Sequence, residues 1–162
     1  MGTQKAKEIK LSSLLKEKFI NLKLEAADKK EVIAELVKLV AQSKKLKNKK
    51  AFYNAILERE SLGSTGIGNG VAIPHAKTKV AADFIIAFAR KDEGIDFGAL
   101  DGENTFLFFI IASPVEAVGG HLKILAEISR LVKDKFTVDL LRKAKDRKEI
   151  LKIIADAGKY IK

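Results

Sequence analysis

Hydrophobic residues near the start of the chain recur every three to four positions, which is the spacing of an amphipathic helix. One helix is predicted over residues 29–44, and DKKE at 28–31 resembles a capping box at its start. The apolar residues at helical spacing are Val32, Leu36, Leu39 and Val40. A second helix is predicted over residues 49–62, with Asn48 as its N-cap.

The pattern changes after Gly63, where short continuous apolar runs replace the helical spacing. The runs at 71–73, 84–89 and 105–112 predict strands, and the two longer runs are typical of strands covered on both faces. Pro74 has no N–H group and is expected to stop the first strand. Residues 93–104 carry the Gly, Asp and Asn signals of turns.

Helical spacing returns at Gly119 and continues toward the end of the chain. A broad apolar stripe predicts a helix over residues 121–133 that covers a sheet. Shorter helices are predicted over 136–144 and 146–157, the last capped by Asp146. Helices, then strands, then helices indicate an α/β fold, a three-layer sandwich of a mixed sheet with helices on both faces. With 162 residues, 47% of them hydrophobic, the chain is expected to form one domain.

The positive charge of the chain raises the question of a polyanionic partner. The 31 Lys+Arg exceed the 21 Asp+Glu and give a net charge of +10. These basic residues are mostly lysines scattered among glutamates. Base-reading surfaces use bidentate arginines, and single-strand binders use basic grooves with interleaved aromatic residues. Neither pattern is present, so no nucleic-acid partner is predicted.

Cysteine is absent, which excludes disulfides, thiolate nucleophiles and cysteine zinc sites. The first residues, MGTQKAKEIK, lack the apolar segment of a signal peptide. The longest apolar run, Phe106 to Ala112, is far shorter than the roughly 18 residues that indicate a membrane span. The expected location is therefore cytoplasmic, without membrane insertion.

The stretch GSTGIGNGVAIPHAK, residues 63–77, places several glycines ahead of one of the chain's two histidines. It fails as a P-loop, because Asn69 and Gly70 stand where Lys and Ser or Thr are required. The dinucleotide fingerprint and the Gly-x-Ser-x-Gly nucleophile elbow fail as well. What remains is a flexible backbone that can approach an anion closely and that ends in His75.

His75 is expected to be largely neutral at cellular pH, so it can attack phosphorus and carry a phosphoryl group as a phosphoramidate. The other histidine, His121, follows Gly119 and Gly120 at the start of a predicted helix, where the helix dipole favours a nearby anion. Taken singly, either histidine is also compatible with a purely structural role. A metal site made of both histidines and a carboxylate is another alternative, disfavoured because the chain has only two histidines and no cysteine.

Two segments resemble a known family. RESLGSTGIGNGVAIPHAKTK, residues 59–79, closely resembles the active-site segment of the fructose/mannitol/nitrogen class of enzyme IIA, from the bacterial phosphoenolpyruvate:sugar phosphotransferase system. HLKILAEISRL, residues 121–131, is similar to that family's second histidine segment. The resemblance spans residues 10–157 as a single domain and leaves residues 1–9 as an N-terminal tail.

The resemblance implies a role for each residue of the site. His75 would accept a phosphoryl group on Nε2 from the phosphocarrier HPr and pass it to a cysteine of an enzyme IIB component. His121 would orient or stabilise the phosphorylated state, and Arg59 would balance the phosphoryl charge. The residues expected to line the site are Ser64, Thr65, Gly66, Gly68 and Gly70. The family fold implies a sheet of about five strands, and the reaction needs no cofactor and no metal ion.

Without a cysteine or a membrane span, the chain is expected to be a free-standing IIA protein that lacks the IIB and transport domains. FIIAFAR at 84–90 and DEGIDFGALDG at 92–102 are closer to the fructose-type members, which favours sugar uptake. The alternative is a nitrogen-type regulatory protein, in which phosphorylation of His75 would control binding to other proteins.

Overall fold

Two long antiparallel strands form the centre of the protein, which is described here for residues 9–160 by a computed structural model. These strands are β5 (Ile85–Ile95) and β6 (Thr105–Pro114). Phe88 lies opposite Phe109 in their pairing, and the two rings meet edge to face with centroids 5.0 Å apart. Both rings are fully buried. The continuous apolar runs therefore predicted buried strands correctly, although both strands extend beyond the predicted ends.

Within the described residues, the sheet has six strands in the order β1-β5-β6-β3-β2, with β4 also paired to β6. The four short strands are β1 (Ile20–Asn21), β2 (Gly66–Gly68), β3 (Val71–Ala72) and β4 (His75–Thr78). Pairing is parallel for β1–β5, β3–β6 and β4–β6, and antiparallel for β5–β6 and β2–β3. The predicted mixed sheet is confirmed, with six strands instead of about five. Strands of two residues, such as β1, are too short to leave a periodic signal in the sequence.

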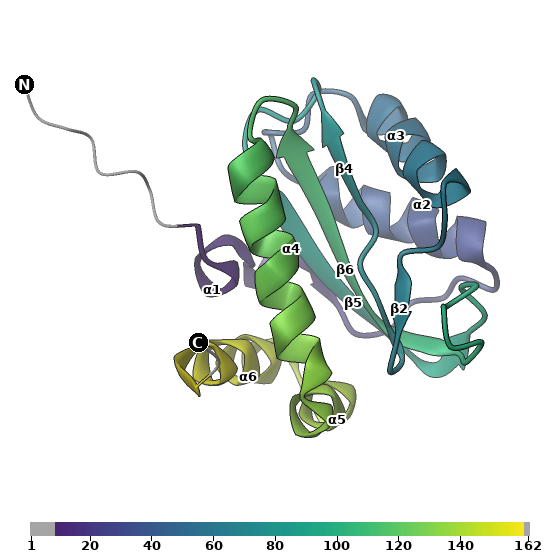
Figure 1. Ribbon diagram of the computed structural model, residues 1–162, viewed down its shortest axis with the longest axis vertical. Coiled ribbons are helices and arrows are strands. Elements are labelled where there is room, and N and C mark those ends of the chain that lie inside the picture. The colour runs from purple at the N-terminus through teal and green to yellow at the C-terminus, as the bar shows by residue number, and fades with distance from the viewer. Residues whose placement is uncertain (1–8, 161–162) are drawn as a thin grey trace, which may run out of the picture.

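Helices cover both faces of the sheet, as predicted for a three-layer sandwich (Figure 1). On one face lie α2 (Lys29–Val40) and α3 (Lys49–Ser61), and on the other lies α4 (Val118–Lys133). Two further helices, α5 (Lys135–Lys143) and α6 (Arg147–Tyr160), lie at the lower end in this view. A short helix α1 (Leu11–Leu14) and a 3-10 turn (Glu17–Phe19) precede β1.

The helix starts agree with the predicted caps. The side chain of Asp28 accepts a hydrogen bond from the Glu31 N–H, and that of Asn48 accepts one from the Ala51 N–H. The first of these helices ends at Val40, four residues before its predicted end. Residues 41–44 form turns there, because the Ser43 N–H bonds back to the Val40 carbonyl in a three-residue step.

The strand that was predicted at 71–73 is interrupted, and a second strand follows it. Pairing stops after Ala72 and resumes at His75, where β4 begins. Pro74 lies in the interruption because it has no N–H to donate to the sheet. His75 then lies opposite Ile111 in the parallel pair of β4 with β6. β4 was not predicted, because HAKT is short and largely polar.

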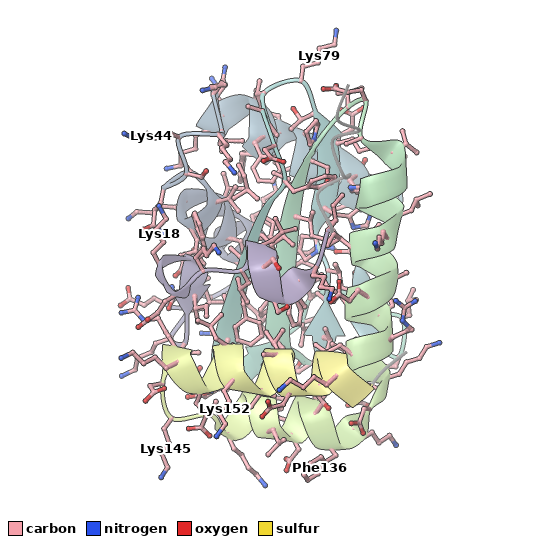
Figure 2. The ribbon with its side chains drawn as sticks, turned by 90° about the vertical axis from the view of Figure 1, so that its left-hand side faces the viewer. Lys18, Lys44, Lys79, Phe136, Lys145 and Lys152 are labelled. Carbon is pink, nitrogen blue, oxygen red and sulfur yellow. The ribbon has the colours of Figure 1, made fainter. Side chains whose placement is uncertain are left out.

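Lysine side chains are exposed on several different elements of the protein. Figure 2 shows five exposed lysines projecting from widely separated parts of the surface. These are Lys18, Lys44, Lys79, Lys145 and Lys152. In the described part of the chain, no helix is long and apolar enough to cross a membrane.

The predicted N-terminal tail, residues 1–9, lies largely outside the described residues. Ile9, its last residue, packs against the core.

Adjacent glycines in the first turn of α4 give a matched test of how this helix is seated. A Cβ on Gly120 would lie 2.5 Å from Cζ of Phe84 and 2.7 Å from Cδ1 of Ile9, whereas a Cβ on Gly119 would meet nothing within 4 Å. Gly120→Ala should therefore lower the free energy of unfolding by about 1–3 kcal/mol. Gly119→Ala should leave it unchanged or raise it by up to about 1 kcal/mol. Urea unfolding of both variants checks this, and equal effects would contradict the packing described.

Candidate functional site

The two histidines of the chain lie side by side, although they come from different elements. His75 is the first residue of β4, and His121 lies in the first turn of α4. Their ring centroids are 5.3 Å apart, and the ring planes are inclined at 53°. His75 is half-buried and His121 is buried. The structure therefore brings together the two residues that the sequence singled out for chemistry.

One hydrogen bond fixes the tautomer of His75. Its Nδ1 lies 2.7 Å from the carbonyl oxygen of Ile73. A carbonyl oxygen can only accept a hydrogen bond, so Nδ1 must carry the hydrogen and donate it. The neutral imidazole then has its lone pair on Nε2. Nε2 is therefore the nucleophilic atom of this side chain.

His121 has a polar partner of its own that the sequence analysis missed. Its Nδ1 lies 2.7 Å from Oγ of Ser113, which is fully buried near the end of β6. Ser113 follows the apolar run of that strand directly, and this was its only signal in the sequence. The contact fixes the orientation of the His121 ring beside His75.

Burial keeps both imidazoles neutral. It is the main cause that lowers the pKa of His75; the charge of Arg59 lowers that pKa further, while the Ile73 carbonyl and Glu60 oppose the shift. Burial also lowers the pKa of His121 to about 4, with smaller contributions from His75 and Lys77. A buried imidazolium would lose its hydration, which explains the direction of both shifts. At neutral pH the pair is uncharged and can act as nucleophile and hydrogen-bond donor.

Arg59 lies in the last turn of α3, close enough to His75 for its charge to lower the pKa of that imidazole. One of its guanidinium N–H groups, on Nη1, donates to the carbonyl oxygen of Gly63 at 2.9 Å. A guanidinium has five N–H donors, so this bond positions the group and leaves four N–H donors for other partners. Arg59 thus lies within electrostatic reach of His75, and its role in balancing phosphoryl charge stays a prediction.

Ser64 and Thr65 were expected to line the site, but the hydroxyl groups of both are engaged in contacts within the protein. Ser64 Oγ donates to the Phe97 carbonyl at 2.9 Å and accepts from the Gly66 N–H at 3.0 Å. Thr65 Oγ1 donates to the carboxylate of Glu60. Each hydroxyl has one hydrogen, and both hydrogens are used inside the protein. These residues therefore shape the loop instead of presenting hydroxyl donors.

The glycines of this segment are explained by the conformation of the backbone and not by contact with a ligand. Gly68 is the last residue of β2 and Gly70 lies in the turn between β2 and β3, with φ angles of 95° and 77°. Val71, which follows Gly70 directly, lies opposite Leu107 of β6, whereas His75 lies opposite Ile111. Val71 and His75 are therefore roughly 13 Å apart along β6, at about 3.3 Å per residue. Gly68 and Gly70 are thus not brought to His75, contrary to the expectation that they line its site. A two-residue hairpin turn requires positive φ angles, which accounts for Gly70, whereas Gly68 lies where the register of β2 with β3 shifts.

Gly66 is required by a close approach of two segments. A Cβ at this position would lie 2.9 Å from Cα of Ala99, in the loop between β5 and β6. The Leu100 N–H also donates to the Gly66 carbonyl at 3.0 Å. Gly66 therefore allows that loop to pack against β2, a role that sequence patterns could not distinguish from anion binding.

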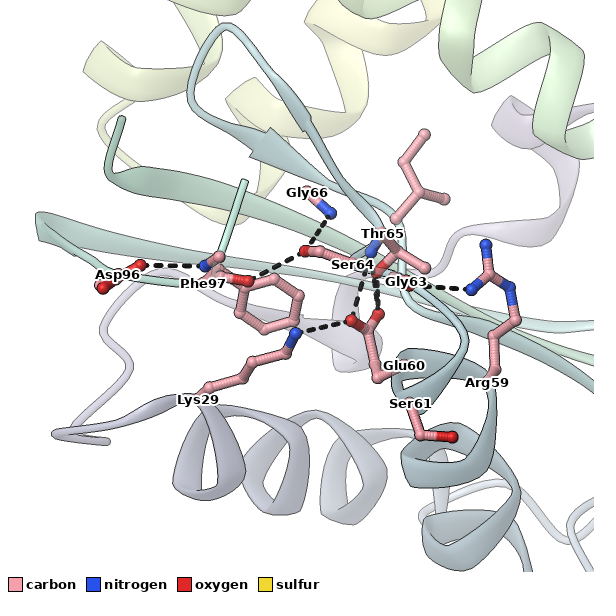
Figure 3. Close-up of polar contacts among 12 residues, drawn as sticks. Lys29, Arg59, Glu60, Ser61, Gly63, Ser64, Thr65, Gly66, Asp96 and Phe97 are labelled. Carbon is pink, nitrogen blue, oxygen red and sulfur yellow. Dashed lines mark hydrogen bonds and ion pairs between the residues drawn. The ribbon is translucent and has the colours of Figure 1, made fainter. Parts of the chain in front are cut away.

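Glu60, next to Arg59, is a buried carboxylate that the sequence analysis did not single out. Figure 3 shows it reaching from the end of α3 toward Thr65, with the ammonium group of Lys29 on its other side. The Lys29 Nζ atom lies 2.8 Å from Glu60 Oε2. The only signal for this role was the position of Glu60 in the last turn of the predicted helix. Within residues 9–160, no group of three His, Asp or Glu side chains is arranged to hold a metal ion.

Comparison with known proteins finds, over most of the chain, the enzyme IIA family that the two sequence segments resemble. The family model described as "Phosphoenolpyruvate-dependent sugar phosphotransferase system, EIIA 2" matches residues 13–157. The chain is 39% identical over 146 residues to the fructose-specific EIIABC component of Bacillus subtilis, covering 90% of this chain and 23% of that protein. The chain therefore spans less than a quarter of the length of that relative.

Other relatives match over most of their length. The nitrogen regulatory protein of Bradyrhizobium diazoefficiens is 37% identical over 132 residues, which is 82% of this chain and 86% of that protein. The fructose-specific EIIA component of Haloferax volcanii is 33% identical over 146 residues, which is 90% of this chain and 95% of that protein.

Solved structures show the same fold. The crystal structure of the nitrogen regulatory protein IIA-Ntr from Neisseria meningitidis matches with a TM-score of 0.83 and 30% identity, over 89% of this chain and 98% of that one. The mannitol enzyme IIA of Escherichia coli, solved in complex with its phosphorylated enzyme IIB, matches with a TM-score of 0.75 and 22% identity, over 88% of this chain and 99% of that one.

The lowered pKa values predict how stability depends on pH. In the unfolded chain the histidines take up protons near pH 6.5, whereas folded His121 does so only near pH 4. The unfolded state therefore binds more protons in this window, and the free energy of unfolding should fall as the pH is lowered from about 6.5 to 4. For His121 alone the loss should be at most about 3 kcal/mol.

NMR titration of the imidazole signals, together with urea unfolding across this pH range, checks the prediction. His121→Gln should flatten the pH dependence of stability in this window. A His121 signal that titrates near pH 6.5 would contradict the burial described.

Proposed function

The chain belongs to the EIIA 2 family of the phosphoenolpyruvate-dependent sugar phosphotransferase system, and on this premise we propose that it carries a phosphoryl group on Nε2 of His75. The observation that carries the proposal is the hydrogen bond from Nδ1 to the Ile73 carbonyl, which leaves the Nε2 lone pair free. Catalysis of phosphoryl transfer depends mainly on positioning the reacting groups and on stabilising the charge of the phosphoryl oxygens.

The transfer step follows from this geometry. Nε2 of neutral His75 attacks the phosphorus atom of the phosphorylated donor, and the bond between phosphorus and donor breaks with its electron pair remaining on the donor. The imidazole of His75 then bears positive charge, and its Nδ1–H remains bonded to the Ile73 carbonyl. A second nucleophile, a cysteine thiolate, attacks the same phosphorus in the next step, and His75 returns to its neutral form.

His121 and Arg59 are proposed to stabilise the phosphoryl oxygens. If Ser113 donates its hydroxyl hydrogen to Nδ1 of His121, the hydrogen of His121 is on Nε2 and is available to a phosphoryl oxygen. Arg59, at the end of α3, has further N–H groups that carry positive charge and can bond to the phosphoryl oxygens. Donors fixed before the reaction stabilise developing charge without reorganisation.

The proposed partners are the phosphocarrier HPr as donor and an enzyme IIB component as acceptor. The mannitol enzyme IIA of Escherichia coli was solved with its phosphorylated IIB, which supports this class of acceptor by analogy. Three exposed apolar side chains border the elements that carry the site. They are Leu62 after α3, and Val118 and Leu122 on the first turns of α4, exposed by 80%, 47% and 59%. Such side chains suit a surface that other proteins contact.

Sugar uptake of the fructose type is the proposed context, supported by the fructose-specific relatives. A second candidate is a nitrogen-type regulatory protein, in which the phosphorylation state of His75 controls binding to other proteins. The nitrogen regulatory relatives, which match over most of their length, support this candidate. The chemistry at His75 is the same in both.

Labelling tests the proposed function. Incubation with phosphoenolpyruvate, enzyme I and HPr should attach a phosphate that is labile in acid and stable in base, as expected of a phosphoramidate, and His75→Ala should abolish the label. An acid-stable label, or an undiminished label in His75→Ala, would contradict the proposal. The labelled protein also separates the two contexts: rapid transfer to a fructose-type IIB cysteine supports uptake, whereas no transfer favours regulation.

The role of His121 has a separate test. His121→Ala should remain folded but slow phosphoryl transfer to or from His75 by on the order of a hundredfold, because a donor to the phosphoryl oxygens is lost. Rapid-quench measurements in both directions give the rates, and thermal unfolding monitors the fold. Unchanged rates in both directions would reduce His121 to a structural residue.

A further inference from the structure

A buried carboxylate at the end of α3 is connected to the site by hydrogen bonds. Glu60 is the one carboxylate that is buried within residues 9–160, with 9% of its surface exposed. Burying a charge is costly unless it is paired, and Lys29 at the start of α2 supplies the pair at 2.8 Å. The Lys29 ammonium also lies 4.5 Å from the centroid of the Phe97 ring, which limits its movement. The carboxylate is thus held from the side of α2.

Thr65 is attached to the other side of this carboxylate. Its N–H lies 3.2 Å from each oxygen of Glu60, and its hydroxyl donates to Oε1. The Thr65 carbonyl accepts from the Ile73 N–H at 3.0 Å. The Ile73 carbonyl in turn accepts from Nδ1 of His75. Unbroken polar contacts therefore lead from Lys29 through Glu60 to the imidazole that attacks phosphorus.

Two neighbouring residues of α3 hold the two ends of one loop segment, Gly63–Thr65. Glu60 binds Thr65 at the far end, while Arg59 binds the Gly63 carbonyl at the near end (Figure 3). Movement of this segment would shift Arg59 and the backbone beside Ile73 together. The geometry therefore couples the position of the guanidinium to the position of the nucleophile.

We propose that Glu60 is a positioning residue for phosphoryl transfer, which acts through Thr65 and the Ile73 carbonyl to keep the hydrogen of His75 on Nδ1. The inference rests on the proposed function and extends it to a residue that does not touch the phosphoryl group. Glu60 is unsuited to contact that group directly, because its oxygens are occupied by Lys29 and Thr65 and carry the same sign of charge. Its negative charge also opposes the lowering of the His75 pKa.

The chain offers a matched control for the test. Glu58→Gln removes one negative charge from an exposed position of the same helix, whereas Glu60→Gln removes it from the buried position. Long-range ¹H–¹⁵N NMR spectra of the unphosphorylated variants report which nitrogen of His75 carries the hydrogen. Rates of phosphoryl uptake from phosphorylated HPr are measured on the same samples.

Glu60→Gln should give His75 signals of mixed tautomers and slow phosphoryl uptake about tenfold to a hundredfold, since small misplacements of reacting groups are costly. Glu58→Gln should match the unsubstituted protein in both measurements. The inference is overturned if Glu60→Gln keeps the Nδ1–H tautomer and the full rate. If Glu60→Gln does not fold, variants that change the Thr65 hydroxyl test the same contact. Thr65→Val should give mixed tautomers and slow uptake, whereas Thr65→Ser should behave like the unsubstituted protein. Identical behaviour of these two variants overturns the inference.

The two measurements separate the inference from the function on which it rests. If the unsubstituted protein takes no phosphoryl group from HPr, the proposed function fails. The tautomer signals require no phosphorylation, so they still show whether Glu60 fixes the hydrogen of His75.

Discussion

The hydrogen bond from Nδ1 of His75 to the carbonyl oxygen of Ile73 is the contact on which the chemistry of the site depends. It can form because the sheet is interrupted at Pro74, between β3 and β4. The Ile73 N–H bonds to the Thr65 carbonyl and the Pro74 carbonyl accepts from the Ile111 N–H. The Ile73 carbonyl faces the imidazole instead. The strand break that proline causes thus selects the reactive nitrogen.

The rest of the site is arranged around a neutral nucleophile. Burial lowers the pKa of both histidines, so neither carries the charge that would abolish its nucleophilicity or repel its neighbour. Positive charge comes from Arg59, at the end of a helix on the opposite face of the sheet from α4. The two faces of the sandwich therefore contribute different groups, and the edge strand β4 holds the nucleophile between them.

Local patterns in the sequence predicted what depends on local physics. Capping by Asp28 and Asn48 and the buried strands of the centre followed from short-range rules. The residue order ending in His75 pointed to this residue as the proposed nucleophile through its resemblance to a family. The partners of the loop were not predictable, because they come from distant segments: Ser64 bonds to a carbonyl 33 positions away. For the same reason Gly66, which packs against Ala99, could not be told from a glycine that approaches an anion.

In the proposed function, Nε2 of His75 carries the phosphoryl group because Nδ1 already donates its hydrogen to the Ile73 carbonyl. The nitrogen that bonds to phosphorus can be identified directly in the phosphorylated, ¹⁵N-labelled protein by NMR coupling between ³¹P and the imidazole nitrogens. We expect coupling of phosphorus to Nε2 of His75, with a hydrogen still on Nδ1. A phosphorus bonded to Nδ1, or bonded to a residue other than His75, would contradict it.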